Sequence, residues 1–204
     1  MWGAVKFAVV AAAVSLALPA TASAPQLTDQ RGDANGVNHQ VYARGAADPS
    51  TPTEPASYAA GDVLSAEWAA TSGGISVTLT LAAPPAEGVS YLVNIQAPGC
   101  GLFLRVEYDA AVAAPPTTNA YCNGTTPIAG VPAAQVSGAR IVWTLPFAAL
   151  TGIASSGDVL TRPWVETRLG VVHPAAAPPS PDGYARARVV VLDMAYGTGS
   201  FVVP

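Results

Sequence analysis

The sequence predicts an all-β protein: a single antiparallel β-sandwich with short helical turns and one disulfide bond. Three observations predict this class. Short segments alternate between apolar and polar residues with a period of two, as half-buried strands do. Turn residues separate these segments, since the chain contains 19 glycines and 19 prolines. No long segment shows the periodicity of an amphipathic helix, and no repeat of fixed period is visible.

The first two expected strands form a hairpin. Asp62–Ala70 alternates in polarity, with Leu64, Ala66 and Trp68 on one face, which we expect to be buried. A Ser-Gly-Gly turn follows. Ile75–Leu81 then alternates apolar residues with Ser or Thr without a fault, which is typical of an antiparallel strand with one buried face.

The later strands are bounded by Gly and Pro. They are expected at Tyr91–Ile95, Gly101–Tyr108, Ala134–Val136, Arg140–Leu145, Gly157–Leu169, Ala187–Met194 and Ser200–Val203, with a short helical turn at Pro146–Leu150. In the second of these strands we expect Leu102 to face the core, and Phe103, Arg105 and Glu107 to face outward. The same alternation places Trp143 in the core.

The amino terminus has the pattern of a cleaved secretory signal peptide. Lys6 precedes an apolar run at 7–18, and an Ala-Ser-Ala cleavage site ends at Ala24. The run is shorter than the about 20 apolar residues that a transmembrane helix needs. We therefore expect residues 1–24 to be removed and residues 25–204 to form one secreted, extracellular and monomeric β-sandwich domain.

The charge of the mature chain excludes two classes of partner. Removal of the signal peptide takes away the single lysine and leaves 13 acidic residues against eight arginines, a formal charge of −5. Nucleic acids and anionic membrane surfaces are bound by basic patches. The composition therefore argues against both, and no later segment is long enough to insert into a membrane.

The two cysteines, Cys100 and Cys122, are expected to form a disulfide because the chain is expected to be exported. Closing a loop of about 22 residues contributes roughly 3 kcal/mol in the chain-entropy model. A metal site or a free thiol pair is also possible, although two thiols without a nearby histidine make a poor zinc site. Asn123-Gly124 follows directly and is expected to form a turn beside the disulfide.

Several short motifs together resemble one group of folds. They are Thr28–Ala34, Gly61–Ala66 leading into Trp68, Val142–Leu150, and Asp193–Ala195 followed by an aromatic residue. The chain resembles the carbohydrate-binding family 9-like and DOMON-like β-sandwiches of secreted actinobacterial proteins. The resemblance implies the sandwich fold. It also implies a sugar or a haem as ligand, since some members bind the one and some the other.

The chain departs from both binding patterns of this group. The sugar-binding members stack their ligand between exposed tryptophans, whereas Trp68 and Trp143 here are expected to face inward, which leaves Trp164 as the exposed platform. Haem-binding members need an axial Met or His. The candidates for that role are His39, His173 and Met194, and no spacing singles them out.

Calcium is the candidate cofactor. Asp29, Asp33 and Asn35 supply oxygens from one turn, and Asp62 or Asp193 could complete the shell. Calcium takes six to eight oxygen ligands and suits such a turn, although the spacing is not that of an EF-hand. The resemblance also implies structural calcium near the amino-terminal strands. A second interpretation is that the aspartates only satisfy the backbone of the turn.

The sequence leaves three functions open. The first is a non-enzymatic binding module for a polysaccharide or another glycan, because aromatic rings pack on the C–H faces of sugars. The candidate contacts are Trp164, Tyr42, Tyr58 and Tyr184. The second is an extracellular structural or surface-interaction protein without a small ligand. The third, an enzyme, is disfavoured because no catalytic motif is present, and Glu67 and Glu107 are exposed-face glutamates that also serve solubility.

Overall fold

The structure is a computed structural model that describes part of the chain. The described residues are 24–34, 58–110, 117–172 and 188–204, with side chains described outside 169–172 and 188–190. The expected signal-peptide run, Asn35, His39, Tyr42, His173 and Tyr184 lie outside these ranges. Across the described ranges, no helix has the length and apolar character required to span a bilayer.

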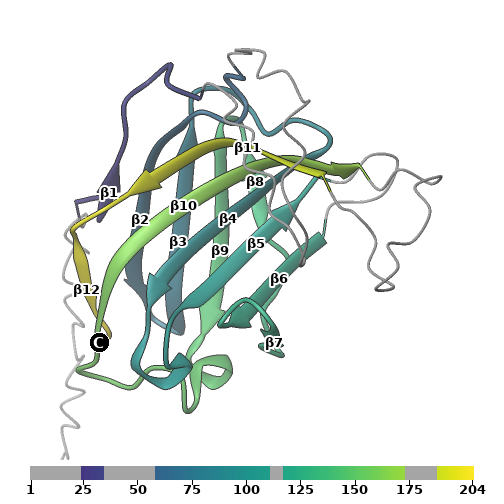
Figure 1. Ribbon diagram of the computed structural model, residues 1–204. Helices are drawn as coiled ribbons and strands as arrows, with labels where there is room; N and C mark the ends of the chain where they lie inside the picture. Colours follow the sequence, from purple (N-terminus) through teal and green to yellow (C-terminus); the bar gives the residue numbers. More distant parts are fainter. Residues whose placement is uncertain (1–23, 35–57, 111–116, 173–187) are drawn as a thin grey trace, which may run out of the picture.

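Two antiparallel sheets pack face to face (Figure 1), which confirms the all-β sandwich. The first sheet has the order β1-β2-β3-β9-β8. Its strands are β1 (Leu27–Thr28), β2 (Val63–Thr71), β3 (Gly74–Leu81), β8 (Gln135–Ser137) and β9 (Arg140–Pro146). The 3₁₀ turn η2 (Phe147–Leu150) follows β9, at the position where the sequence predicts a helical turn.

The second sheet has the order β11-β10-β4-β5-β6-β7, and β12 pairs with the first residues of β10. Its strands are β4 (Val89–Gln96), β5 (Leu104–Asp109), β6 (Thr117–Cys122), β7 (Thr126–Pro127), β10 (Val159–Val172), β11 (Arg188–Tyr196) and β12 (Ser200–Val202). The 3₁₀ turn η1 (Pro98–Cys100) links β4 to β5. The long strand β10 thus lies between β4 and the carboxy-terminal strands, as Figure 1 shows.

The core lies between the sheets and contains both tryptophans that the alternation pattern places there. Trp68 is 1% exposed and Trp143 is fully buried. The indole Nε1 of Trp143, on β9, donates a hydrogen bond of 3.2 Å to the backbone oxygen of Glu107, on β5. One side chain therefore fills the core and also joins the two sheets.

Two face assignments from the sequence are wrong. Val63 is fully buried, whereas Leu64 is only half-buried, because the register of β2 against β3 shifts after Val63. Leu102 is 66% exposed because β5 begins at Leu104, so Leu102 belongs to the turn before the strand. From Leu104 onward the expected alternation holds.

Candidate metal centre and ligand pocket

The turn at residues 29–34, which follows β1, is here called the amino-terminal turn. It meets β2 and β11 at a group of four carboxylates, here called the acidic cluster: Asp29, Asp33, Asp62 and Asp193. Oxygens of Asp29, Asp33 and Asp193 lie within 4.8 Å of one another. The backbone N–H of Asp29 donates to the oxygen of Leu64, 3.0 Å away, so the short strand pairing of β1 with β2 holds the turn in place.

Asp62 lies beside the same turn and is 3% exposed. Its Oδ2 accepts a 2.8 Å hydrogen bond from the backbone N–H of Gly32, between Asp29 and Asp33. Its Oδ1 is buried and has no hydrogen-bond partner among the described residues, and the same is true of Oδ1 of Asp33. A buried oxygen without a partner is costly, so both atoms are suited to accept a ligand.

The electrostatics of the acidic cluster favour a bound cation. Burial first, and then the charges of Asp29 and Asp33, together raise the pKa of Asp193 to about 6, although the N–H of Val63 donates a 2.8 Å bond to its Oδ2 and opposes this rise. Burial and the charges of Asp33 and Asp62 likewise raise the pKa of Asp29. In the described part of the chain, no arginine forms an ion pair with any of the four carboxylates.

Among the described residues, the donor set is made of carboxylate oxygens, without a cysteine or histidine. Such hard ligands fit Ca²⁺ or Mg²⁺ better than zinc or copper. Of the five residues that the sequence proposes as calcium ligands, the structure brings four close to one turn. The fifth, Asn35, lies outside the described residues.

A second candidate site is a pocket of about 540 Å³ at the end of the second sheet, here called the aromatic pocket. It is lined by Gln96, Leu102, Phe103, Arg162, Pro163, Trp164, Tyr196 and Gly197. These residues come from the first half of β10, from the ends of β4 and β11, and from the turn before β5. The volume lies within the range of small-molecule sites.

Three aromatic side chains line this pocket. The rings of Phe103 and Trp164 meet edge to face, with centroids 5.0 Å apart and an interplanar angle of 75°. Tyr196 pairs with Trp164 in the register of β11 against β10, and it is 71% exposed. A large, exposed tyrosine beside a half-buried tryptophan offers apolar surface to a ligand.

Two polar residues next to the aromatic side chains help to hold them in place. Asn94 is fully buried, and its Oδ1 accepts a 2.8 Å hydrogen bond from Nε of Arg105. The guanidinium of Arg105 lies 5.2 Å from the ring centroid of Phe103, a cation–π distance. Burial, and then the charge of Arg168, lower the pKa of Arg105. Phe103 is therefore held between Trp164 and Arg105.

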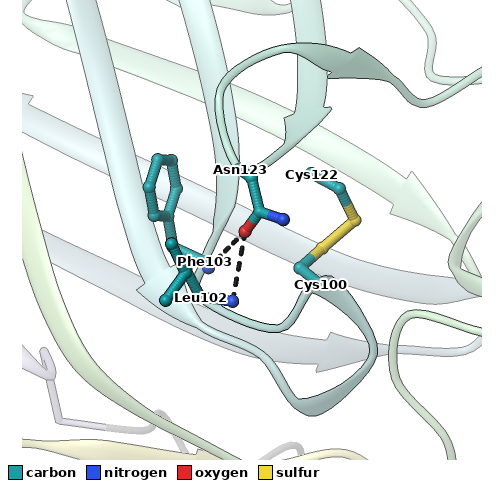
Figure 2. The surroundings of a disulfide bond; sticks show 5 residues. All are labelled: Cys100, Leu102, Phe103, Cys122 and Asn123. Carbon is teal, nitrogen blue, oxygen red and sulfur yellow. Dashed lines mark hydrogen bonds between the residues drawn. A yellow bond between two sulfur atoms is a disulfide. The ribbon is translucent and has the colours of Figure 1, made fainter.

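The disulfide fixes the turn that carries Leu102 and Phe103 (Figure 2). Cys100 and Cys122 are joined, with Cα atoms 5.0 Å apart, which confirms the expected pairing. Next to it, Oδ1 of Asn123 accepts hydrogen bonds from the backbone N–H groups of Leu102 and Phe103, at 3.1 and 3.3 Å. Asn123 has a φ of 54°, so the expected Asn-Gly turn is present and supports one wall of the pocket.

Within the described residues, the structure places only one of the four residues that the sequence proposes as sugar contacts in this pocket. Trp164 lines the aromatic pocket, whereas Tyr58 does not, since it lies beside the amino-terminal turn, where its N–H donates to Ala34. Tyr42 and Tyr184 lie outside the described residues. Phe103 and Tyr196 were missed as contacts, although the alternation of the strand already placed Phe103 on the outer face.

The positions of Glu67, Glu107 and Met194 bear on the enzyme and haem hypotheses. Glu67 lies on β2 of the first sheet and Glu107 on β5 of the second, so the structure does not bring them together as a carboxylate pair. Met194, a candidate haem ligand, is 38% exposed, and its sulfur accepts a hydrogen bond from the Tyr196 hydroxyl. Both histidines lie outside the described residues.

In comparisons with protein-family models, curated proteins and solved structures, nothing matches this chain. The resemblance to carbohydrate-binding family 9-like and DOMON-like sandwiches therefore stays a prediction from short motifs.

Proposed function

We propose that this chain is a secreted, non-enzymatic binding module that takes a glycan in the aromatic pocket and is stabilised by calcium at the acidic cluster. The observation that carries the glycan proposal is the convergence of Phe103, Trp164 and Tyr196 on one pocket of about 540 Å³. Aromatic faces pack against the C–H surfaces of sugar rings, and Gln96 adds a hydrogen-bonding amide to the same lining.

The pocket is also held in shape before any ligand arrives. The disulfide and Asn123 fix the turn on one side, and the Arg105–Asn94 hydrogen bond supports Phe103 from below. A site with fixed walls loses less conformational entropy on binding, which favours recognition of a rigid sugar ring.

Replacing Tyr196 by alanine is expected to weaken glycan binding about tenfold, or about 1.4 kcal/mol, because the exposed ring contributes apolar contact area. The full domain would be screened on an oligosaccharide array, and the affinity for the best-retained oligosaccharide would then be measured by titration calorimetry. Because Tyr196 is largely exposed, its loss should leave the melting temperature nearly unchanged.

The matched control is Tyr58→Ala, which removes another partly exposed tyrosine, one that does not line the pocket. Its affinity should equal that of the unmodified domain. If no oligosaccharide is retained, or if the two alanine variants lose affinity equally, the aromatic pocket is not a glycan site. A surface-interaction protein without a small ligand would then replace the proposal.

The calcium part of the proposal rests on the buried, unpartnered Oδ1 of Asp62 together with the close approach of Asp29, Asp33 and Asp193. The four neighbouring, partly buried carboxylates repel one another, and a divalent cation would neutralise this charge and bind the oxygens that have no hydrogen-bond partner. Because these residues join the amino-terminal turn to β2 and β11, the ion would tie both sheets together.

Calcium at 1 mM is expected to raise the melting temperature by about 3–6 °C over the same protein in EDTA. This follows from about 1.4 kcal/mol of linkage for an extracellular site with a dissociation constant near 0.1 mM. The measurement is differential scanning calorimetry of the whole domain, with magnesium as a parallel titrant.

Two variants test where the ion binds. Asp193→Asn should abolish the calcium-dependent shift, whereas Asp109→Asn, which removes a carboxylate on β5 away from the acidic cluster, should retain it. No shift in the unmodified domain, or an equal shift in both variants, would show that the acidic cluster is not a calcium site.

A further inference from the structure

Among the described residues that line the aromatic pocket, one is charged, and it is an arginine. Arg162 is exposed and lies two positions before Trp164 on β10. Among the described residues, none forms an ion pair with Arg162, and no acidic residue lines the pocket. An available guanidinium beside aromatic surface is notable in a chain of formal charge −4.

The backbone holds Arg162 in an unusual conformation. Its φ is 51°, in the left-handed region, and proline follows it, which further restricts its backbone. The pairing of β10 with β4 shifts register between Thr161 and Trp164, so Arg162 sits in a bulge of the strand. Bulges redirect side chains, and costly backbone conformations of this kind cluster at ligand sites.

Neighbouring residues keep the bulge in place. The residue before it, Thr161, pairs with Ser200 of β12, and its hydroxyl donates to Oε1 of Gln96 at 3.3 Å. The residue after it, Pro163, is buried, and its carbonyl accepts a 2.8 Å bond from the N–H of Gly197. Arg162 is therefore anchored on both sides while its own side chain remains exposed.

We infer that the aromatic pocket recognises a sugar that carries a carboxylate, a uronic acid, with Arg162 binding the carboxylate and Trp164 and Tyr196 contacting the ring. This inference rests on the proposed glycan-binding function and names its ligand class. The planar guanidinium donates two parallel hydrogen bonds to a planar carboxylate, a match that a neutral hydroxyl does not offer. Because no acidic residue is among the described lining residues, none competes with the ligand's carboxylate for the guanidinium of Arg162.

The test compares matched probes on the whole domain. Oligosaccharides terminated by glucose and by glucuronic acid, otherwise identical, are titrated into the unmodified protein, with a sulfated glucose probe as a third arm. The glucuronate probe is expected to bind at least tenfold more tightly than the glucose probe. Arg162→Gln should remove this preference, so that the two probes bind the variant with equal affinity.

The control is Arg140→Gln, which makes the same charge change at an exposed residue of β9 outside the pocket, and it should keep the preference. Equal affinity for glucose and glucuronate probes, with both lost in Tyr196→Ala, would overturn the uronate inference and leave the glycan site standing. Tighter binding of the sulfated probe would also overturn it. Binding that Tyr196→Ala does not change, or no binding of any probe, would overturn the proposed function itself.

Discussion

Replacing Trp143 by alanine is expected to destabilise the domain by about 3–5 kcal/mol, a large part of the total stability of a single domain. The side chain is fully buried between the sheets, so its removal leaves a cavity lined by core residues. It also removes the hydrogen bond from Nε1 to the backbone oxygen of Glu107, which joins β9 to β5. Urea denaturation monitored by circular dichroism gives the free energy of unfolding directly.

Two further variants separate the contributions of Trp143. Trp143→Phe keeps most of the apolar area but leaves the carbonyl of Glu107 without its donor, and it should cost less than the alanine variant. Thr144→Ala, at the next, exposed position of β9, should change stability by less than about 0.5 kcal/mol. A loss below about 1 kcal/mol for Trp143→Ala would contradict the placement of this residue in the core.

Replacing both Cys100 and Cys122 by alanine is expected to cost roughly 3 kcal/mol, because the unfolded chain regains the entropy of the closed loop. The same change should weaken ligand binding, since the bridged turn carries Leu102 and Phe103 into the wall of the aromatic pocket. The stability is measured by urea denaturation. The affinity for the best-retained oligosaccharide is measured by titration calorimetry.

The matched variant for this turn is Asn123→Gly. Glycine tolerates the positive φ and removes only the side-chain oxygen that accepts from Leu102 and Phe103. This variant should weaken the affinity for the oligosaccharide and leave the free energy of unfolding nearly unchanged, because the disulfide remains. The unmodified protein with its disulfide reduced should have the same stability and the same affinity as the double alanine variant. A double variant with unchanged stability and affinity would show that the bridge supports neither the fold nor the pocket.

The fold was predictable where a strand carries its own periodic signal. The Ile75–Leu81 segment, which forms β3, alternates without a fault, and both core tryptophans follow from alternation alone. β6 was missed because Thr117–Cys122 has little apolar content and therefore no apolar alternation. It becomes a strand by pairing with β5. β1 was missed because two residues carry no period. The burial of Val63 depends on a bulge, which alternation does not encode.

The sites were predictable only as lists of chemically suitable residues. Asp29 and Asp33 share one turn, and that proximity is visible in the sequence. Asp193, by contrast, reaches them only through the placement of β11 beside β10, far along the chain. The aromatic pocket is harder still to predict, because Tyr196 meets Trp164 through the register of β11 against β10, whereas Phe103 reaches Trp164 from the turn before β5. The bulge that sets Arg162 beside Trp164 has no signal in the sequence beyond the proline that follows it.

The lengths of the outer strands have a consequence for self-association. In the described part of the chain, the first sheet ends on β1 and β8, of two and three residues, and one side of the second sheet ends on β7, of two residues including a proline. Such short edges offer little backbone for another copy to pair with and thereby oppose aggregation. The nine-residue β11 is the long edge, so growth of a sheet from one molecule into the next would start there, beside Tyr196.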